Sequence, residues 1–205
     1  MPDAREHSTF HLAPRGLTRI ARRLGIVLGL ACGATSANAQ EMDVPVALQM
    51  PLFLKVISFD HLLPARTAGT LLVGVAYQSG HRPSGQVKDA VLLAGADLGR
   101  AINGLDVRFV AIDLDHVELA ETLERLHVTV LYVAPMRGLD VAMLSATTRA
   151  AHVTTVTGVS RYVEQGLAIG VRLRGDRPQI LVNLGASRLE GAELGAELLK
   201  LAQVL

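Results

Sequence analysis

The sequence predicts a three-layer α/β fold: a mixed, mostly parallel sheet with helices on both faces, ending in a C-terminal β-hairpin and a closing helix. Between positions 70 and 157, short apolar runs alternate with amphipathic helical segments. This alternation implies crossover connections and a parallel sheet that is covered on both sides. Two later apolar runs flank a Gly-Asp-Arg-Pro turn, which is the pattern of an antiparallel hairpin.

The first 39 residues have the features of a secretory signal peptide. A basic region with four arginines precedes a short apolar run at 24–31, and Ala-Asn-Ala supplies a cleavage pattern before position 40. The apolar run is far shorter than the roughly 20 residues that span a bilayer. We therefore expect export to the periplasm, cleavage after Ala39 and a single domain over residues 40–205. Lipidation of Cys32 is the alternative, although Gly29 stands where that signal prefers a branched apolar residue.

The composition excludes several classes of function. Aromatic residues make up 3% of the chain and Trp is absent, so there is little surface on which bases or sugars could stack. Five of the 20 basic and two of the 19 acidic residues lie in the leader, which leaves 15 basic and 17 acidic residues and a net charge of −2. No basic block remains for nucleic acid. The only cysteine, Cys32, leaves with the leader, so disulfides and thiol chemistry are not expected.

The elements of the mature chain begin with a helix over 44–59, in which Pro45 suits the first turn and Pro51 either kinks the helix or begins it. A loop over 60–69 follows. Gly104 is expected to cap the second helix, and Asp115 begins the third with Glu118 at the capping-box spacing. The alternating part consists of strands at 70–77, 105–112, 127–133 and 152–157 and helices at 86–103, 115–125 and 139–150.

The C-terminal part breaks this alternation. Strands are expected at 167–172 and 179–184 around the turn at 174–178, and a helix over 185–205. The apolar face of that helix consists of Leu189, Leu194, Leu198, Leu199 and Val204.

The stretch most like an enzyme motif is Asp113-Leu114-Asp115, which follows an apolar strand. Such a pair resembles the nucleophile motif of haloacid-dehalogenase-type phosphatases, in which one carboxylate attacks phosphorus and the other is an acid/base beside magnesium. That chemistry also needs a downstream lysine and a further acidic pair, yet Lys200 is the only lysine after Asp115. We therefore interpret Asp115 as a helix cap and Asp113 as a solvated strand end, with phosphatase activity as an alternative.

Motifs for metals, nucleophiles and phosphates are weak. Ser145 and Ser160 lack the G-x-S-x-G elbow, and the glycines are too widely spaced for a phosphate loop. No two histidines of the mature chain have the i, i+4 spacing of zinc ligands on a helix. We expect no metal or cofactor. The histidines are His61, His81, His116, His127 and His152.

A polar turn at 162–166 follows the fourth predicted strand of the alternating part. Open α/β sheets bind ligands or partners at the carboxyl ends of their strands. From the residues alone we interpret the turn as a plain connection in which Gly166 supplies a positive φ. A partner surface is the alternative.

Residues 156–205 resemble the C-terminal region of the YfiR/HmsC-like periplasmic proteins. In that family a T-V-S-like strand end precedes a Glu-Gln-Gly turn, an I-N-L strand and a helix with Leu-Leu-x-Leu-Ala. In two respects the chain departs from the pattern: strand 127–133 lacks a cysteine, which removes redox control, and Leu167 replaces a second glycine. The matching segments are Thr157-Gly158-Val159-Ser160, Glu164-Gln165-Gly166, Leu181-Val182-Asn183-Leu184 and Leu198-Leu199-Lys200-Leu201-Ala202.

The resemblance implies a non-enzymatic periplasmic regulator. Members of the family bind the periplasmic sensing domain of an inner-membrane diguanylate cyclase and repress it, which lowers cyclic di-GMP and biofilm formation. A homodimer is compatible with the resemblance and nucleic acid is not an expected partner. A periplasmic small-molecule binding module is the main alternative, although a single lobe offers no interdomain cleft. The expected partner surface consists of Ser160, Arg161, Tyr162, Glu164, Gln165, Gly166 and Asn183.

Overall fold

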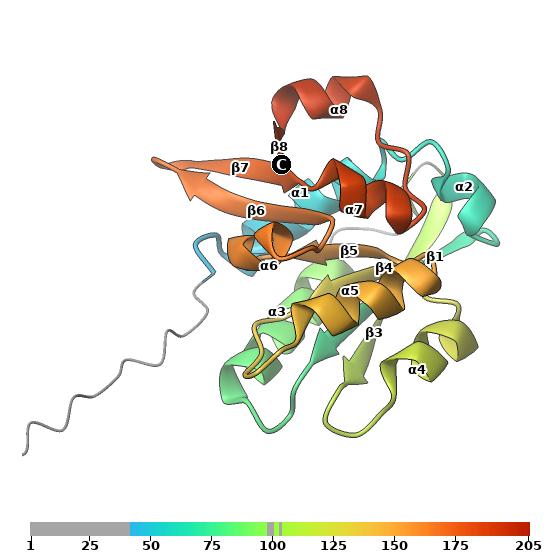
Figure 1. The fold of residues 1–205 in the computed structure, drawn as a ribbon, viewed down its shortest axis with the longest axis vertical. Coiled ribbons are helices and arrows are strands. Elements are labelled where there is room, and N and C mark those ends of the chain that lie inside the picture. The colour runs from blue at the N-terminus through green and yellow to red at the C-terminus, as the bar shows by residue number, and fades with distance from the viewer. Residues whose placement is uncertain (1–41, 98–100, 103) are drawn as a thin grey trace, which may run out of the picture. The chain divides into compact units, whose positions relative to one another are not determined.

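Figure 1 shows the computed structural model of the chain, which describes residues 42–97, 101–102 and 104–205. The expected leader, its cleavage site and Cys32 lie outside the described residues. The strands are β1 Thr70–Tyr77, β2 Ala101–Ile102, β3 Leu105–Asp113, β4 Val130–Val133, β5 Thr154–Thr157, β6 Ile169–Arg174, β7 Arg177–Val182 and β8 Gln203–Val204. The helices are α1 Val46–Ile57, α2 Leu63–Arg66, α3 Arg82–Asp97, α4 Leu119–Leu126, α5 Val141–Ala150, α6 Ser160–Glu164, α7 Leu184–Leu189 and α8 Ala196–Leu201.

The strands form one mixed sheet in the order β2-β3-β1-β4-β5-β6-β7-β8. The five central strands β3, β1, β4, β5 and β6 are parallel, whereas β2 and β7 run antiparallel to their neighbours β3 and β6. The chain leaves β1 in one direction to form β3 and returns past it to form β4, so the strand order reverses between β1 and β4. This sheet confirms the predicted α/β class with a C-terminal hairpin.

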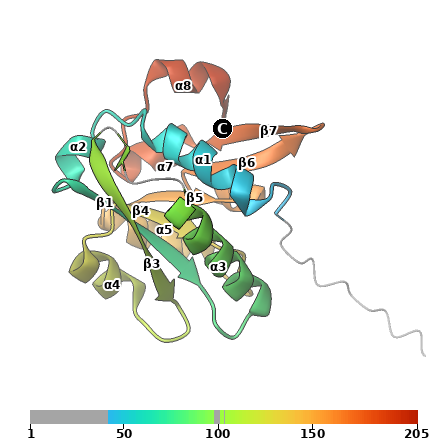
Figure 2. The ribbon, with the colours of Figure 1, turned by 180° about the vertical axis from the view of Figure 1, so that it is seen from behind.

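Helices cover both faces of the sheet. Figures 1 and 2 show α4, α5 and α6 on one face and α1 and α3 on the other. Successive residues of β4 alternate between the two cores: Tyr132 packs with Phe53 of α1, and Leu131 belongs to the core under α4 and α5. A strand that is buried on both faces has a continuous run of apolar residues in its sequence. Because β1 has such a run, the sequence predicted this strand with its observed bounds.

The predicted second helix is wrong at both ends. Helix α3 begins at Arg82, because Pro83 suits a first helical turn, in which its missing N–H is not needed. It ends at Asp97, and β2 then pairs with β3. Gly104, with φ +81°, lies between these two strands and does not cap the helix. The loop expected over 60–69 contains the short helix α2.

Helix α4 begins at Leu119 with Glu118 as its N-cap residue, so the expectation that Asp115 caps this helix is wrong. Helix α5 has a side-chain cap, in which Asp140 Oδ1 accepts the Met143 N–H at 3.0 Å. Strands β4 and β5 each begin later than predicted. His127 and His152, both with φ +54°, end the preceding helical turns in the left-handed conformation, and extended structure starts after them.

The predicted C-terminal helical region is present, but the expected single helix over 185–205 is divided into α7 and α8. Helix α7 ends at Leu189, Gly191 takes φ +83°, and Asp60 Oδ1 accepts the Glu193 N–H at 2.9 Å. The chain is thus drawn across to the end of α1 before α8 and the edge strand β8 form. As a result Leu189 and Val204 of the predicted apolar face are exposed, while Leu194 and Leu198 are buried.

Candidate partner-binding surface

The region with the Glu-Gln-Gly signature follows β5, and its first part is the five-residue helix α6 rather than a turn. Arg161, Glu164 and Gln165 are exposed, and Ser160 and Gly166 are half-buried. Asn183, the N-cap residue of α7, is also half-buried. The structure therefore gathers six of the seven predicted partner residues around α6, and three of them, Glu164, Gln165 and Gly166, form one continuous stretch of solvent-accessible chain.

Tyr162 differs from the others because its side chain is fully buried. Its hydroxyl accepts the Met136 N–H at 3.1 Å and donates to the Met136 carbonyl at 3.3 Å. The expected surface contact of Tyr162 is therefore wrong. The ring instead anchors α6 to the loop that follows β4.

Two side chains hold the backbone of this region from below. Arg149 Nη2 on α5 donates to the Gly166 carbonyl at 3.1 Å, and Asn183 Nδ2 donates to the Val163 carbonyl at 3.3 Å. Asn183 Oδ1 also accepts the Ala186 N–H at 3.0 Å, so this one side chain joins α6 to the start of α7. Gly166 has φ +129°, a conformation that favours glycine. The backbone is thus fixed while the Glu164 and Gln165 side chains stay exposed.

A buried carboxyl group lies behind this region. Glu190, with no exposed surface, accepts the Thr155 N–H at 2.7 Å, the Thr155 hydroxyl at 2.9 Å and the Thr148 hydroxyl at 3.1 Å. Thr155 Oγ1 in turn accepts the Ala168 N–H at 2.8 Å, two residues after Gly166. Burial raises the pKa of Glu190 to about 7, although the hydrogen bonds and nearby Arg149 act in the opposite direction.

Asp113 and Asp115 hold the loop that follows β1. Asp113 Oδ1 accepts the Ser79 N–H at 3.1 Å, and Asp115 Oδ2 accepts the Gly80 N–H at 2.8 Å. His116 Nδ1 lies 2.9 Å from Asp113 Oδ2. Partial burial alone would raise the pKa of Asp113, but these contacts and the Asp115 N–H lower it to about 2. Asp113 and Asp115 therefore fix the loop that follows β1 by accepting its backbone N–H groups. Asp113 makes more hydrogen bonds than expected for the solvated strand end that the sequence predicted.

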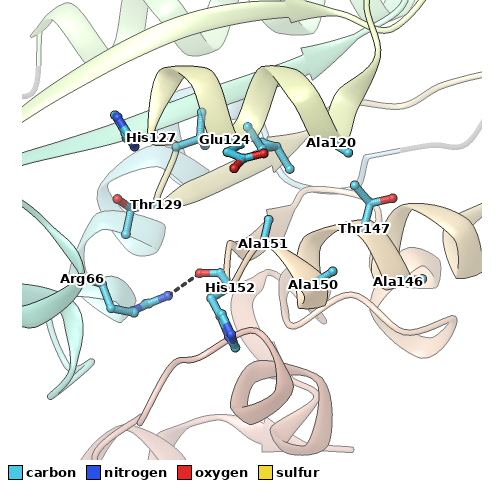
Figure 3. Close-up of a pocket in the computed structure, with 12 residues that line it drawn as sticks. Arg66, Ala120, Glu124, His127, Thr129, Ala146, Thr147, Ala150, Ala151 and His152 are labelled. Atoms are coloured by element: carbon cyan, nitrogen blue, oxygen red, sulfur yellow. Dashed lines mark hydrogen bonds between the residues drawn. The ribbon is translucent and has the colours of Figure 1, made fainter.

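Two pockets lie away from α6. A groove of about 850 Å³ runs between α4 and α5, with Arg66 and His152 near one end and Ala120 and Ala146 near the other (Figure 3). A smaller pocket of about 300 Å³ lies between α1 and α3 beside Pro135, which follows β4. The second pocket is close to the point where the strand order reverses, the usual place for a ligand in an open α/β sheet.

The described residues contain neither a helix that could span a membrane nor a cluster that could hold a metal ion. Within residues 42–97, 101–102 and 104–205, no helix is long and apolar enough to cross a membrane. In the same ranges no group of three or more His, Cys, Asp or Glu side chains is arranged to hold a metal ion.

Sequence reasoning missed the side chains that support the surface from within. Arg149 and Glu190 act through contacts with residues far along the chain, and neither belongs to a motif. The sequence did contain one signal for the start of the two neighbouring strands β4 and β5. The tripeptide His-Val-Thr occurs at 127–129, between α4 and β4, and again at 152–154, between α5 and β5. The repeat marks two equivalent helix-to-strand junctions.

A family model described as YfiR/HmsC-like matches residues 91–203, more than half of the chain. No curated protein matches the sequence.

Two solved structures share the fold at low identity. An "ABC domain in complex with L-Trp" from Streptococcus pneumonia has 16% identity and a TM-score of 0.55, with 78% of this chain and 60% of that chain covered. A conserved domain protein from Vibrio cholerae O1 biovar eltor has 14% identity and a TM-score of 0.51 with the same coverage. The chain thus spans about three fifths of the length of these structures.

Proposed function

The chain belongs to the YfiR/HmsC-like family, and from this premise we propose that it is a non-enzymatic periplasmic regulator, exported by a leader cleaved after Ala39, with a single domain over residues 40–205. In this proposal it binds the periplasmic sensing domain of an inner-membrane diguanylate cyclase and represses it. Cyclic di-GMP and biofilm formation fall as a result.

The observation that carries the proposal is the exposed end of α6, which lies inside the region that the family model matches. Glu164 and Gln165 offer a carboxylate and an amide to a partner, while Arg149 and Asn183 hold the backbone beneath them. A surface whose backbone is already ordered loses less conformational entropy when it binds. Ser160, Arg161 and Gly166 complete this surface, and Tyr162 supports it from the core.

Repression requires that the protein bind the inactive conformation of the cyclase more tightly than the active one. The difference between the two affinities then sets how far the equilibrium shifts, and a ligand with equal affinity for both states shifts nothing. Release of the regulator returns the cyclase to its own equilibrium and raises cyclic di-GMP.

Deletion of the gene, with cellular cyclic di-GMP as the readout, tests this function. We expect cyclic di-GMP to rise on deletion and to return to its initial level when the wild-type gene is restored. The Glu164→Ala/Gln165→Ala variant should fail to restore it. The matched control is Glu118→Ala/Glu197→Ala, which removes two exposed carboxylates elsewhere on the molecule and should restore repression.

Periplasmic levels of each variant must be equal, as measured by immunoblot of the periplasmic fraction. Unchanged cyclic di-GMP on deletion would contradict the repressor function. Full repression by the Glu164/Gln165 variant would instead leave the function standing and remove these two residues from the partner surface.

A second candidate function is a small-molecule binding module. It is favoured by the pocket between α1 and α3 near the reversal of strand order, and by the fold shared with a domain solved in complex with L-Trp. A ligand that binds only the native state raises the unfolding temperature by mass action. If this function holds, we expect at least one amino acid in a screen of L-amino acids to raise the unfolding temperature of the protein. The Val87→Phe substitution on the wall of the pocket should abolish that increase.

A further inference from the structure

Glu190, the C-cap residue of α7, connects this helix to the backbone that follows α6. Its buried carboxyl group contacts the hydroxyls of Thr148 on α5 and Thr155 on β5. Thr155 Oγ1 also accepts the Ala168 N–H at 2.8 Å, and Ala168 directly precedes β6. Glu190 thus lies within two hydrogen bonds of the chain segment that continues from Gly166.

Within the described part of the chain, Arg149 of α5 is the cation whose charge acts on the Glu190 carboxyl group, and it belongs to no ion pair there. Arg66 of α2 donates to the Glu190 backbone carbonyl, and its charge is paired with Asp60. Strand β5 and residues 167–171 contain no titratable side chain. On α6, on α7 and in the adjoining segments, Tyr162 is buried against Met136 and the remaining titratable groups are exposed, namely His152, Arg161, Glu164, Arg188 and Glu193.

Arg149 also supports the exposed end of α6. Its Nη2 donates to the Gly166 carbonyl at 3.1 Å, while its Nε is buried and has no hydrogen-bond partner among the described residues. Ser145 Oγ, one turn earlier on α5, is buried and unpartnered in the same way. A buried donor without a partner is unfavourable, so the observed arrangement does not use the full hydrogen-bonding capacity of Arg149.

Ionisation of Glu190 changes the electrostatic force on Arg149. Neutral hydroxyl and N–H donors satisfy the oxygens of an ionised Glu190, but they leave a buried negative charge without a counter-ion. An ionised Glu190 therefore attracts the Arg149 guanidinium, whereas a protonated Glu190 does not. Burial raises the pKa of Glu190 to about 7, so both forms are populated near neutral pH.

We propose that Glu190 is a pH-sensitive switch that acts on the exposed end of α6 through Arg149. When Glu190 is protonated, Arg149 remains on the Gly166 carbonyl and fixes the backbone beneath Glu164 and Gln165. When Glu190 is ionised, it draws the guanidinium toward itself, and the end of α6 loses this support. An ordered surface loses less entropy on binding, so a partner should bind more tightly below neutral pH than above it. This switch rests on the proposed function, in which the partner contacts α6.

Amide hydrogen exchange of the purified mature protein, followed by NMR between pH 6 and pH 8, tests the switch without a partner. Two amides report on the end of α6: the Gly166 N–H bonds to the Val163 carbonyl at 3.2 Å, and the Leu167 N–H bonds to the Tyr162 carbonyl at 3.0 Å. After correction for the intrinsic exchange rate, their protection should fall about threefold or more as the pH rises, because the end of α6 opens locally when Arg149 leaves it. The amides of β1 report any change in global stability.

Three variants separate the switch from other titrations. Glu190→Gln removes the charge, so the protection of the two amides should no longer depend on pH. Arg149→Met removes the support itself, so their protection should be low at both ends of the range. Arg188→Gln, which removes an exposed arginine of α7, is the control and should respond to pH like the wild type. Circular dichroism confirms that each variant is folded.

Three outcomes of the exchange experiment would overturn the proposal: protection in the wild type that does not change with pH, protection that changes only in parallel with β1, or a pH response that persists in Glu190→Gln. No partner is present in this experiment, so the regulator function is tested separately by the deletion of the gene.

A second measurement tests the effect of the switch on the partner. Relative to the deletion strain at the same pH, the wild type should lower cyclic di-GMP by a larger factor in medium at pH 6 than at pH 8. A strain that carries Glu190→Gln should lower it by the same factor in both media. Equal repression by the wild type at both pH values would show that the protonation of Glu190 does not control partner binding.

Discussion

Glu190 is a completely buried carboxyl group that has two hydroxyl partners, and one of them can serve either protonation state. Thr148 Oγ1 lies 3.1 Å from Glu190 Oε1 and 3.2 Å from the Ser145 carbonyl, and a hydroxyl has one hydrogen to donate. When Glu190 is ionised, Thr148 donates to it. When Glu190 is protonated, it can donate to Thr148, which then donates to Ser145. Rotation of the Thr148 hydroxyl therefore allows the site to hydrogen-bond both the ionised and the protonated form of Glu190.

The raised pKa of Glu190 predicts a pH-dependent stability. The folded value of about 7 lies above the ordinary 4.5, so the native state binds the proton more tightly than the unfolded state does. The contribution of this group is fully present below about pH 4.5 and is lost as the pH rises through 7. The free energy of unfolding should fall by on the order of 3 kcal/mol across this window. Urea denaturation at pH 5, 6, 7 and 8 measures it.

Glu190→Gln is the control for this prediction because it keeps the size of the side chain and removes the titration. The difference between wild-type and variant stabilities should change with pH in the stated direction, since all other titrating groups are shared. Two parallel stability curves would show that Glu190 does not titrate in this range.

The backbone conformation of Gly166 leads to a prediction that compares the effects of two glycine-to-alanine substitutions on stability. An added Cβ at Gly166, where φ is +129°, would lie 3.3 Å from Ser145 Oγ and 3.4 Å from Arg149 Nη2. Gly166→Ala should lower the free energy of unfolding by roughly 1–3 kcal/mol through backbone strain and loss of the Arg149 contact. Gly185→Ala, at an exposed position of α7 where an added Cβ would lie near Asn183 Oδ1 alone at 3.6 Å, should leave the free energy of unfolding unchanged or raise it. Equal losses in the two variants would contradict this account.

At the scale of elements, the sequence predicted the bounds of β1 and β3 to within one residue. The two hairpin strands were predicted at 167–172 and 179–184, whereas β6 spans Ile169–Arg174 and β7 spans Arg177–Val182, so the turn between them is shorter than expected. Continuous apolar runs predict strands β1 and β3, and a Gly-Asp turn predicts the hairpin. Both signals lie within a short stretch of the sequence. The closing helix was mispredicted because Gly191 and the Asp60 contact with the Glu193 N–H redirect the chain, and Asp60 is 133 positions away. Strand β2 was missed because two residues are too short for any periodic signal.

Helix α1 is joined to the sheet by one buried polar contact, which yields a prediction at this scale. Tyr132 Oη on β4 donates to Gln49 Oε1 at 2.9 Å, and both side chains are fully buried. Tyr132→Phe leaves the Gln49 oxygen without this donor, so it should lower the free energy of unfolding by about 1–2 kcal/mol. Chemical denaturation measures the loss.

Tyr77→Phe is the control, because Tyr77 is half-buried and its hydroxyl has no hydrogen bond to other parts of the chain that the structure describes. Its ring lies near Lys88 Nζ at 5.2 Å, and a phenylalanine keeps that contact. A stability loss for Tyr77→Phe as large as for Tyr132→Phe would contradict the assigned role of the buried hydrogen bond.

The whole molecule shows why only part of the candidate surface was predictable. Glu164 and Gln165 belong to a contiguous motif, so a resemblance along the chain could find them. Tyr162 belongs to the same motif, yet its burial depends on Met136, which comes from another loop. Arg149, Asn183 and Glu190 reach α6 or its neighbours only after the sheet has assembled. A motif identifies which residues are present, whereas tertiary contacts decide which of them reach the surface.

Arg66 joins parts of the fold that are far apart in the sequence, and it carries the last prediction. Its Nη2 lies 2.5 Å from Asp60 Oδ2 and 3.0 Å from Thr154 Oγ1, and its Nη1 donates to the His152 and Glu190 carbonyls. Arg66→Met leaves the Asp60 carboxylate, which is 4% exposed, without its counter-ion. Removal of one partner from a buried ion pair costs about 3–5 kcal/mol. We expect a loss of this size in urea denaturation.

Two comparisons distinguish this charge effect from a general loss of packing. Arg108→Met breaks the exposed pair with Asp106, in which Arg108 is 69% exposed, and should cost less than about 1 kcal/mol. Asp60→Asn in the Arg66→Met background removes the uncompensated charge and keeps an oxygen for the Leu62 and Glu193 N–H groups. The double variant should therefore be more stable than Arg66→Met alone. A double variant that is less stable would show that Arg66 stabilises the fold through its packing and carbonyl contacts rather than through Asp60.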